Sequence, residues 1–218
     1  MTETTKMLVQ CDFDGTVTEE DVSFMLLDTF AEGNWRERLK EYEAGRISVG
    51  RFNMEAFSMI KVGREALLEV VRRKTKVRPG FKEMVAYCRR RGIRFVIVSN
   101  GLDFYIKEIM DGLGLEDVEI FAARTHFHPG SIEVHYVGPE GNYLDDNFKG
   151  AYVNSFLGEG YCVVYMGNGT SDILASKDCH HIFATSTLLS HCERTGRECT
   201  PFTDFAEVLS VIKGWSCK

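Results

Sequence analysis

The sequence has few prolines, no long apolar run and no surplus of positive charge. It contains four prolines in 218 residues, and its 26 Lys and Arg are outnumbered by 32 Asp and Glu, for a net charge of −6. No stretch offers the about 18 consecutive apolar residues that a membrane-spanning helix needs. An acidic chain also disfavours a broad basic face for nucleic acid or anionic lipid. We therefore expect no nucleic-acid partner and no membrane association.

A secretion signal and a disulfide framework are missing as well. The first ten residues, MTETTKMLVQ, lack a charged start followed by an apolar core. The seven cysteines are an odd number without a C-x-x-C pair, and Cys11, Cys88 and Cys162 lie in apolar or helix-patterned stretches. We expect a cytoplasmic protein whose cysteines are free thiols that act as small apolar side chains.

Composition and length predict one large globular domain, or one domain that carries a sizeable insertion. Apolar residues make up 44% and charged residues 27%, as in ordinary packed proteins. The chain is longer than a typical domain of about 150 residues. A first apolar strand at 7–11 is followed by nearly sixty residues of helical pattern, up to about residue 76. Glycines divide this block into several short helices.

The rest of the chain alternates between strands and helices, which predicts an α/β fold. Apolar runs predict strands at 93–98, 118–122, 161–166 and 181–184, and residues 124–137 predict a hairpin around Pro129-Gly130. Helical patterns cover 80–91, 102–111, 148–157, 186–194 and 204–213. This order is typical of a three-layer, Rossmann-like parallel sheet with right-handed crossovers.

Polar loops stand at the ends of three predicted strands and at the start of one helix. They are Asp12-Phe13-Asp14-Gly15-Thr16, Ser99-Asn100-Gly101, Asp145 to Gly150, and Gly167 to Asp172. Ligands of open parallel sheets bind at the carboxyl ends of the strands. The loops therefore mark the candidate site.

The first loop suggests phosphoryl transfer. Two carboxylates as close as Asp12 and Asp14 repel unless a proton or cation lies between them, and hard oxygen ligands with a phosphate suit Mg²⁺. One Asp can attack phosphorus to give an aspartyl-phosphate, while the other protonates the leaving oxygen and later activates water. The alternative is a solvated turn.

The other loops each allow a phosphate or metal role beside a simpler one. Ser99 and the amides after it can bind phosphoryl oxygens, or Ser99 can be a helix N-cap. Lys149 lies at a helix start, where the dipole disfavours a cation, so it either meets an anion or is a solvated surface lysine. Asn168 and Asp172 can ligate a metal, with glycines that allow close backbone approach.

Taken in order, D-x-D-G-T, Ser-Asn-Gly, Lys and G-N-G-x-S-D resemble the four motifs of the haloacid dehalogenase superfamily of phosphatases. The helical insertion resembles the small cap of its phosphoserine phosphatase branch. Three further segments are similar to the subgroup containing the methionine-salvage phosphatase that acts on 2-hydroxy-3-keto-5-methylthiopentenyl-1-phosphate. These segments are Arg78-Pro79-Gly80-Phe81, Ser99 to Ile106, and Thr200-Pro201-Phe202.

The resemblance implies a phosphomonoester hydrolase of small phosphorylated metabolites, a monomer or homodimer, with Mg²⁺ as cofactor. Residues 1–17 and 77–218 would form the core and residues 18–76 the helical cap. Asp12 would be the nucleophile and a metal ligand, and Asp14 the acid/base, ligating metal through its carbonyl. Ser99 and Lys149 would hold the phosphoryl group and stabilise the transition state. Further implied are phosphate contacts from Gly15, Thr16, Asn100 and Gly101, and metal contacts from Asn168 and Asp172, the latter as a ligand or by orienting ligands.

Two departures from the pattern affect these expectations. The fourth motif usually begins G-D-G, and Asn168 in place of the acid predicts weaker Mg²⁺ binding. Met54 stands where phosphoserine enzymes carry an arginine for the substrate carboxylate, although Asp21 matches the acid that faces the substrate amine. A phosphoserine phosphatase, a phosphotransferase with the same intermediate, and a catalytically weakened metabolite-binding protein remain alternatives.

Two sets of side chains outside the motifs can have either a structural or a functional role. Soft apolar groups in the insertion can line a pocket for an apolar tail or form the core of the cap. They are Phe24, Met25, Trp35, Phe52, Met54, Phe57 and Met59. Histidines and cysteines at 126–135, 179–181 and 191–192 can bind a transition metal or occupy ordinary positions.

Overall fold

The computed structural model describes residues 6–215 and places their strands in one eight-stranded sheet, in the order β5-β4-β3-β2-β1-β6-β7-β8. The strands are β1 (Met7–Cys11), β2 (Arg94–Leu102), β3 (Glu119–His128), β4 (Ser131–Val137), β5 (Tyr143–Leu144), β6 (Cys162–Gly167), β7 (His181–Ala184) and β8 (Thr200–Pro201). The six neighbouring strands β3, β2, β1, β6, β7 and β8 run parallel to one another. At one edge of the sheet, β4 pairs antiparallel with β3, and β5 pairs antiparallel with β4. The predicted parallel sheet is confirmed.

Helices flank this sheet. They are α1 (Val22–Phe30), α2 (Trp35–Glu43), α3 (Val49–Phe57), α4 (Arg64–Lys74), α5 (Phe81–Arg91), α6 (Asp103–Gly112), α7 (Phe148–Gly158), α8 (Ser171–Ala175), α9 (Ser186–Thr195) and α10 (Phe205–Gly214). Every residue of β6 is buried. Because successive side chains of a strand point to opposite faces, both faces of the sheet must be covered there, which gives the three layers.

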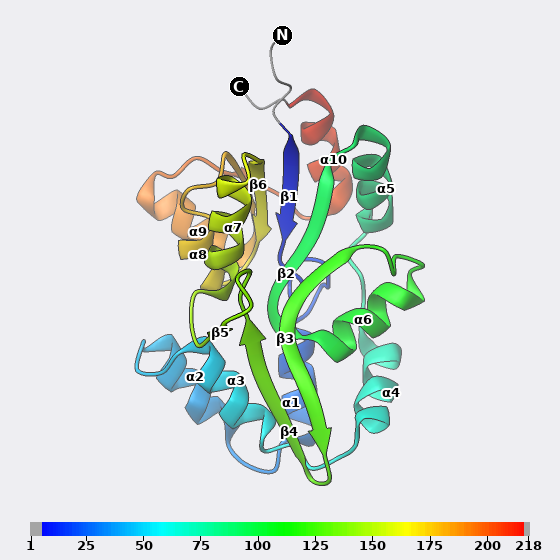
Figure 1. Cartoon of the computed structure of the whole chain (residues 1–218), viewed down its shortest axis with the longest axis vertical. Coiled ribbons are helices and arrows are strands. Elements are labelled where there is room, and N and C mark those ends of the chain that lie inside the picture. Colours follow the sequence, from blue (N-terminus) through cyan, green and yellow to red (C-terminus); the bar gives the residue numbers. More distant parts are fainter. Residues whose placement is uncertain (1–5, 216–218) are drawn as a thin grey trace.

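Helices α1 to α4 lie beyond the carboxyl end of β1, beside the lower parts of β3 and β4 (Figure 1), and α3 packs against β4. Local capping sets where two of them start, since Asp21 accepts a hydrogen bond from Phe24 N at α1 and Ser48 accepts one from Arg51 N at α3. The two ends of this helical segment meet in a short antiparallel bridge between Thr18 and Val77. The segment therefore leaves and re-enters the sheet region at one place.

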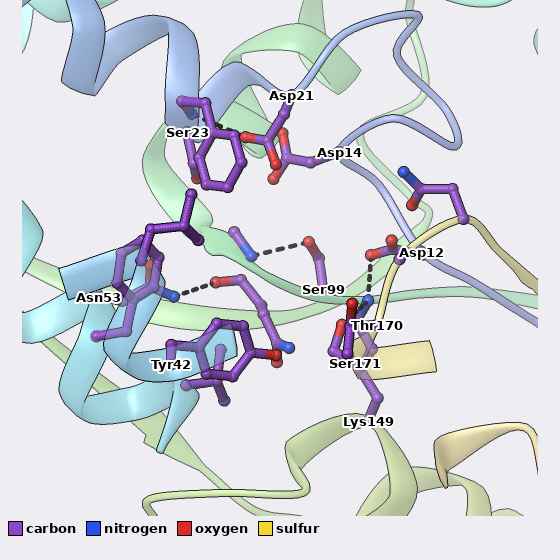
Figure 2. Close-up of a pocket in the computed structure, with 18 of the residues that line it drawn as sticks. Asp12, Asp14, Asp21, Ser23, Tyr42, Asn53, Ser99, Lys149, Thr170 and Ser171 are labelled. Atoms are coloured by element: carbon purple, nitrogen blue, oxygen red, sulfur yellow. Dashed lines mark hydrogen bonds and ion pairs between the residues drawn. The ribbon is translucent and has the colours of Figure 1, made fainter. Parts of the chain in front are cut away.

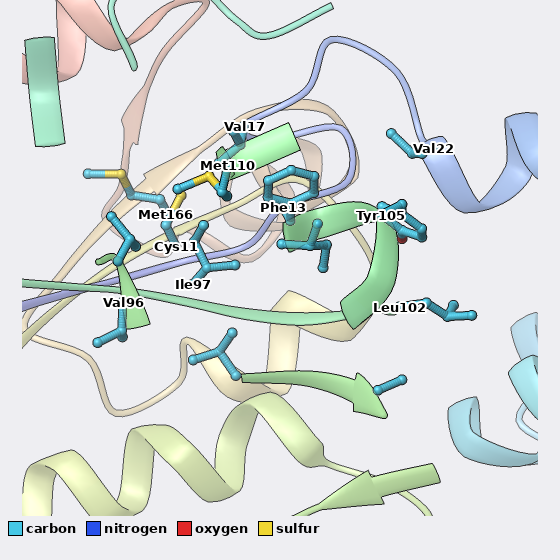
Figure 3. Close-up of a cluster of buried hydrophobic side chains, with 14 of the residues drawn as sticks. Cys11, Phe13, Val17, Val22, Val96, Ile97, Leu102, Tyr105, Met110 and Met166 are labelled. Atoms are coloured by element: carbon cyan, nitrogen blue, oxygen red, sulfur yellow. The ribbon is translucent and has the colours of Figure 1, made fainter. Parts of the chain in front are cut away.

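The hydrophobic core runs without a break from the sheet into the start of the helical segment. Figure 3 shows Cys11, Ile97 and Met166 from the three central strands, with Val17 from the loop after β1 and Val22 from the start of α1. All five are at most 2% exposed. Burying an aliphatic side chain of this size stabilises a fold by about 1.5–3 kcal/mol. This packing fixes the carboxyl ends of β1, β2 and β6 relative to α1.

Several details differ from the sequence predictions. The strand predicted at 118–122 and the first arm of the hairpin are one continuous strand, β3, because no glycine or proline interrupts residues 119–128. The short elements β5, β8 and α8 were not predicted; they are two to five residues long, too short to show a period. No helix between residues 6 and 215 has the length and apolarity to cross a membrane.

The prediction of free thiols is only partly right. Cys11, Cys88, Cys179, Cys192 and Cys199 are free. Cys162 is disulfide-bonded, so the prediction is wrong at that position. An odd number of cysteines excludes complete pairing but not a single pair. Cys217 lies outside the described residues.

Candidate active site

The central strands bring the four predicted loops together at one edge of the sheet. Cys11 of β1 is in register with Ile97 of β2 and Met166 of β6. Strands β1 and β6 therefore end side by side, whereas β2 continues to Leu102. A hydrogen bond of 2.9 Å from Asp12 N to Met166 O continues the pairing of β1 with β6 by one residue. Asp12, Ser99, Lys149 and residues 168–171 all line one cavity.

Lys149 is a buried cation between two carboxylates. Its Nζ lies 2.8 Å from Oδ1 of Asp12 and donates to Ser171 Oγ at 3.1 Å (Figure 2). The same Nζ lies 2.7 Å from Oδ1 of Asp172. Only 3% of Lys149 is exposed, which excludes the surface-lysine alternative. Burial alone would lower its pKa, but the two carboxylates outweigh burial and raise it, so the ammonium keeps its charge.

Asp172 fixes the position of Lys149 and of the loop at residues 168–169. Its Oδ1 accepts from Lys149 and from the Tyr165 hydroxyl at 2.6 Å, and its Oδ2 accepts from the amides of Asn168 and Gly169 at 3.0 and 2.8 Å. These four bonds match the about four lone-pair positions of a carboxylate. Of the two roles predicted for Asp172, the geometry favours orienting Lys149 and the 168–169 loop over direct metal ligation.

Asp12 is almost fully buried beside this pair. Burial, and then the charge of Asp172, raises its pKa to about 7, while Lys149 acts in the opposite direction. Lys149 engages one carboxylate oxygen, Oδ1. The carboxylate therefore keeps its second oxygen, which Lys149 does not engage, at the wall of the cavity.

Asp14 follows Asp12 by two residues and is held by two donors. The Val22 amide donates to Oδ1 at 3.0 Å and the Tyr105 hydroxyl donates to Oδ2 at 2.5 Å. Burial, and then the charge of Asp21, raises the pKa of Asp14 well above its ordinary value. Asp14 is thus a carboxyl group whose environment favours the protonated form, as an acid catalyst requires.

Ser99 lies within strand β2 and not at a helix start. Its Oγ accepts from the Gly101 amide at 2.9 Å, and the N-cap position of α6 belongs to Leu102. The N-cap alternative for Ser99 is therefore excluded. Figure 2 shows the Ser99 side chain in the cavity between Asp14 and Lys149.

Asn168 and the loop after Asp14 approach each other closely. Thr16 donates to Oδ1 of Asn168 at 3.1 Å. A Cβ on Gly15 would lie 2.2 Å from Asn168 Nδ2, and Gly15 has a φ of +72°. Glycine satisfies both demands, the left-handed backbone and the close contact.

Metal ligation at this edge would depend on oxygen donors of mixed type. No cluster of three His, Cys, Asp or Glu side chains suited to a metal occurs in the described part of the chain. The transition-metal hypotheses for the histidine and cysteine groups are therefore not supported, although the rings of His126 and His135 are 5.0 Å apart. The Asp12 carboxylate, the Asp14 carbonyl and the Asn168 amide oxygen remain as hard ligands of the kind that suits Mg²⁺.

The cavity has a volume of about 320 Å³ and is closed on its far side by α1, α2 and α3. Its apolar lining comes from Phe24, Leu39, Val49 and Phe52, with Tyr42 beside them. Of the soft apolar residues predicted for such a pocket, only Phe24 and Phe52 line it; Trp35 and Phe57 belong to the core, and Met54 is 49% exposed. Among the described lining residues, Lys149 is the one cation.

Several site residues escaped sequence reasoning. Tyr105 and Tyr165 donate to the carboxylates described above, and Asn53 donates to Asn100 O and to the Tyr136 hydroxyl. Each tyrosine lies in an apolar stretch that is indistinguishable from core in the sequence. Only the fold shows that their hydroxyls reach polar groups far away in the chain.

Several known proteins similar to this chain are named as phosphatases. A family model described as haloacid dehalogenase-like hydrolase matches residues 9–177. The 2-hydroxy-3-keto-5-methylthiopentenyl-1-phosphate phosphatase of Geobacillus kaustophilus is 30% identical over 216 residues, covering 96% of this chain and 97% of that protein. The protein of the same name from Exiguobacterium sibiricum is 29% identical, with 94% and 95% coverage. The resemblance predicted from the motifs, including the one to the methionine-salvage subgroup, is confirmed.

Solved structures similar to this chain share its fold. A substrate-bound phosphoserine phosphatase complex superposes with a TM-score of 0.73 at 22% identity, covering 96% of this chain and 99% of that one. A phospho-aspartyl intermediate analogue of phosphoserine phosphatase gives a TM-score of 0.70, also at 22% identity, with 95% and 99% coverage.

Proposed function

The chain belongs to the haloacid dehalogenase-like hydrolase family, and we propose that it is a Mg²⁺-dependent phosphatase that forms an aspartyl-phosphate on Asp12. Its phosphatase relatives make it a phosphoric monoester hydrolase. The proposal adds the intermediate, the metal and the roles of individual residues. The observation that carries it is the buried Asp12–Lys149–Asp172 arrangement at the carboxyl end of β1.

The proposed reaction has two steps. An oxygen of Asp12 attacks phosphorus, the bond from phosphorus to the leaving oxygen breaks, and Asp14 gives its proton to that oxygen. Water then attacks the phosphorus of the aspartyl-phosphate while Asp14 takes a proton from the water. The bond between phosphorus and the Asp12 oxygen breaks, which releases phosphate and restores the Asp12 carboxylate. Lys149 and Ser99 hold the phosphoryl oxygens throughout, in a site where fixed charges act with little screening. Gly15, Thr16, Asn100 and Gly101 supply the remaining predicted phosphate contacts.

The residues at the site fit a magnesium ion. Four acidic residues, Asp12, Asp14, Asp21 and Glu43, line the cavity against one described cation, Lys149, and a divalent cation would balance this surplus of acidic groups. Asp12, the Asp14 carbonyl and Asn168 would hold the ion, with Asp172 orienting Asn168. When bound, Mg²⁺ would neutralise charge on the phosphate oxygens.

A small phosphorylated metabolite without a carboxylate is the substrate we propose, as for the methionine-salvage relatives. A substrate carboxylate would need a second cation in the cavity, and the described lining offers only Lys149. Phosphoserine is the second candidate, because Asp21 lines the cavity and could face an amine. The apolar side chains of Phe24 and Phe52 favour the first candidate, which has an apolar methylthio tail.

We also propose that residues 18–76 act as a cap on a core formed by residues 1–17 and 77–218. The bridge between Thr18 and Val77 supports this division, since it joins the two ends of the segment. The cap contributes the apolar wall of the cavity, so its closure would exclude water from the reacting phosphate.

Two measurements test the function. Turnover of 2-hydroxy-3-keto-5-methylthiopentenyl-1-phosphate, phosphoserine and p-nitrophenyl phosphate with Mg²⁺ present should rank the methionine-salvage substrate first. Asp12→Asn, which keeps the size of the side chain, should abolish turnover of all three while the melting temperature stays near that of the wild type. Substantial residual turnover by a folded Asp12→Asn protein would refute the nucleophile.

A further inference from the structure

A chain of hydrogen bonds lies beside the cavity, between α1, α6 and the loop after β1. The Tyr105 hydroxyl lies 2.5 Å from Oδ2 of Asp14 and 2.8 Å from Oγ of Ser23. A tyrosine hydroxyl carries one hydrogen, and the Asp14 carboxylate accepts it. Ser23 therefore donates to Tyr105, which donates to Asp14.

The position of the Tyr105 hydroxyl is fixed by its surroundings. Tyr105 is fully buried, and its ring contacts the rings of Phe104 and Phe13 at centroid distances of 5.4 and 6.4 Å. Its hydroxyl is therefore brought to Asp14 by core packing and not by a mobile surface side chain.

The backbone leaves room for this bond at Gly101. A Cβ at that position would lie 2.1 Å from the Tyr105 hydroxyl and 2.2 Å from Oδ2 of Asp14, closer than any real contact. The contact between Tyr105 and Asp14 thus occupies the space that any other residue at 101 would fill. This second observation ties the bond to the strand end that carries Ser99.

We propose that Tyr105 is a positioning residue that holds the Asp14 carboxyl in the orientation from which its proton reaches the leaving oxygen. The inference rests on the proposed phosphatase function. The Val22 amide holds Oδ1 and Tyr105 holds Oδ2, so rotation of the carboxyl about its χ angles is restrained at both oxygens. Each oxygen keeps a second in-plane position for the proton that is transferred. Tyr105 does not line the cavity and acts only through Asp14.

A positioning role and a merely structural role differ in how they respond to the leaving group. p-Nitrophenolate departs as a stabilised anion and needs little protonation, whereas phenolate needs more. If Tyr105 serves proton transfer, its loss must lower kcat/KM for phenyl phosphate more than kcat/KM for p-nitrophenyl phosphate. If Tyr105 serves only packing, its loss must lower kcat/KM for the two esters by the same factor.

The experiment compares kcat/KM for these two esters in the wild type, Tyr105→Phe and Tyr152→Phe. This parameter covers the steps up to cleavage of the bond between phosphorus and the leaving oxygen. Positioned acid catalysis contributes about 10²–10⁴-fold, so a partly misplaced Asp14 should lower the phenyl to p-nitrophenyl ratio by about tenfold in Tyr105→Phe. Tyr152→Phe also loses a buried hydroxyl, one that donates to Val137 O, and should leave the ratio unchanged.

Gly101→Ala gives a second, independent test, because its Cβ displaces the contact while Tyr105 is retained, and its backbone does not need a positive φ. Gly101→Ala should also lower the ratio of kcat/KM for phenyl phosphate to that for p-nitrophenyl phosphate. If Tyr105→Phe is too unstable to assay, Gly101→Ala alone tests the proposal. Equal losses on both esters in the folded variants overturn the positioning role. A wild type inactive on both esters overturns the proposed function, and the role of Tyr105 with it.

Discussion

At the scale of single residues, Asn168 is the departure with the clearest chemical consequence. Its backbone amide is held by Asp172 and its Oδ1 accepts from Thr16, so the side chain is positioned as a ligand would be. It supplies a neutral amide oxygen where related motifs supply a carboxylate. One unit of negative charge is therefore missing from the proposed magnesium site.

We predict that Asn168→Asp binds Mg²⁺ more tightly than the wild type. An added charge in contact with the ion should be worth at least ~1.4 kcal/mol, or about tenfold in Kd, after the cost of desolvating the carboxylate. Calorimetric titration of Mg²⁺ into both proteins measures the difference. Asn142→Asp adds the same charge on an exposed loop and should leave the Kd within about twofold. Equal or weaker binding by Asn168→Asp would contradict the prediction.

At the scale of elements, α3 connects the helical segment to the rest of the molecule. Ser48, at its N-cap, donates to Oδ2 of Asp145 at 2.7 Å, and the Gly50 amide donates to the Asp145 carbonyl at 3.0 Å. One turn further on, Asn53 donates to Asn100 O at 3.0 Å. These bonds hold the apolar wall of the cavity against β2 and the loop before α7.

We predict that Asp145→Ala raises KM by about fivefold with little change in kcat. The variant loses the bond from Ser48 and keeps the one to its own carbonyl, and a single such bond contributes ~1 kcal/mol to docking. Steady-state kinetics with p-nitrophenyl phosphate measures the effect.

Asp146→Ala is the matched control for Asp145→Ala. It removes the same charge from the neighbouring position, and the one hydrogen bond of the Asp146 side chain within residues 6–215 comes from the adjacent Asn147 amide. Electrostatic effects on an anionic substrate should therefore be similar in the two variants. A KM that rises equally in both would mean that the bond to Ser48 does not help to close the cavity.

The site loops could be predicted from the sequence because topology alone brings them together. Buried runs before Asp12, Ser99 and Asn168 predict parallel strands, and polar residues that follow such runs gather at one edge of a sheet, although β2 itself continues to Leu102. Lys149 could be recognised from its unfavourable place at a helix start. Such arguments need only local patterns and the general geometry of a sheet.

The contacts that hold the site could not be predicted in this way. Tyr105 is 91 residues from Asp14 and 82 from Ser23, and nothing in its local sequence marks its hydroxyl as bonded. The bond between Asn53 and the Tyr136 hydroxyl likewise spans 83 residues. Such pairs depend on the position of each helix relative to the sheet. Tertiary packing determines that position, and local sequence periodicity does not.

At the scale of the whole molecule, a chain of net charge −6 concentrates carboxylates around its cavity. Asp21 is one of these carboxylates: it caps α1 through a bond of 2.8 Å from Phe24 N to its Oδ1 and also lines the cavity. Burial raises its pKa from 3.8 to about 6, although the capping bond and Lys149 act in the opposite direction. The folded protein therefore resists ionisation of this group.

The raised pKa of Asp21 gives a stability prediction with a definite sign. Between pH 4 and 6 the folded state retains the Asp21 proton that the unfolded state releases, so folding stability from this group is full below about pH 4 and is lost as pH rises through about 6. Asp21→Asn keeps an oxygen for the capping bond and cannot ionise. In metal-free buffer, the free energy of unfolding in urea should therefore fall less with rising pH in Asp21→Asn than in the wild type. The gap should open between pH 4 and 6 and stay constant above. Asp178→Asn, at an exposed turn, should show the same pH dependence of the free energy of unfolding as the wild type.

A difference in the free energy of unfolding between Asp21→Asn and the wild type that shrinks with rising pH would contradict the prediction. It would show that the fold stabilises the Asp21 anion.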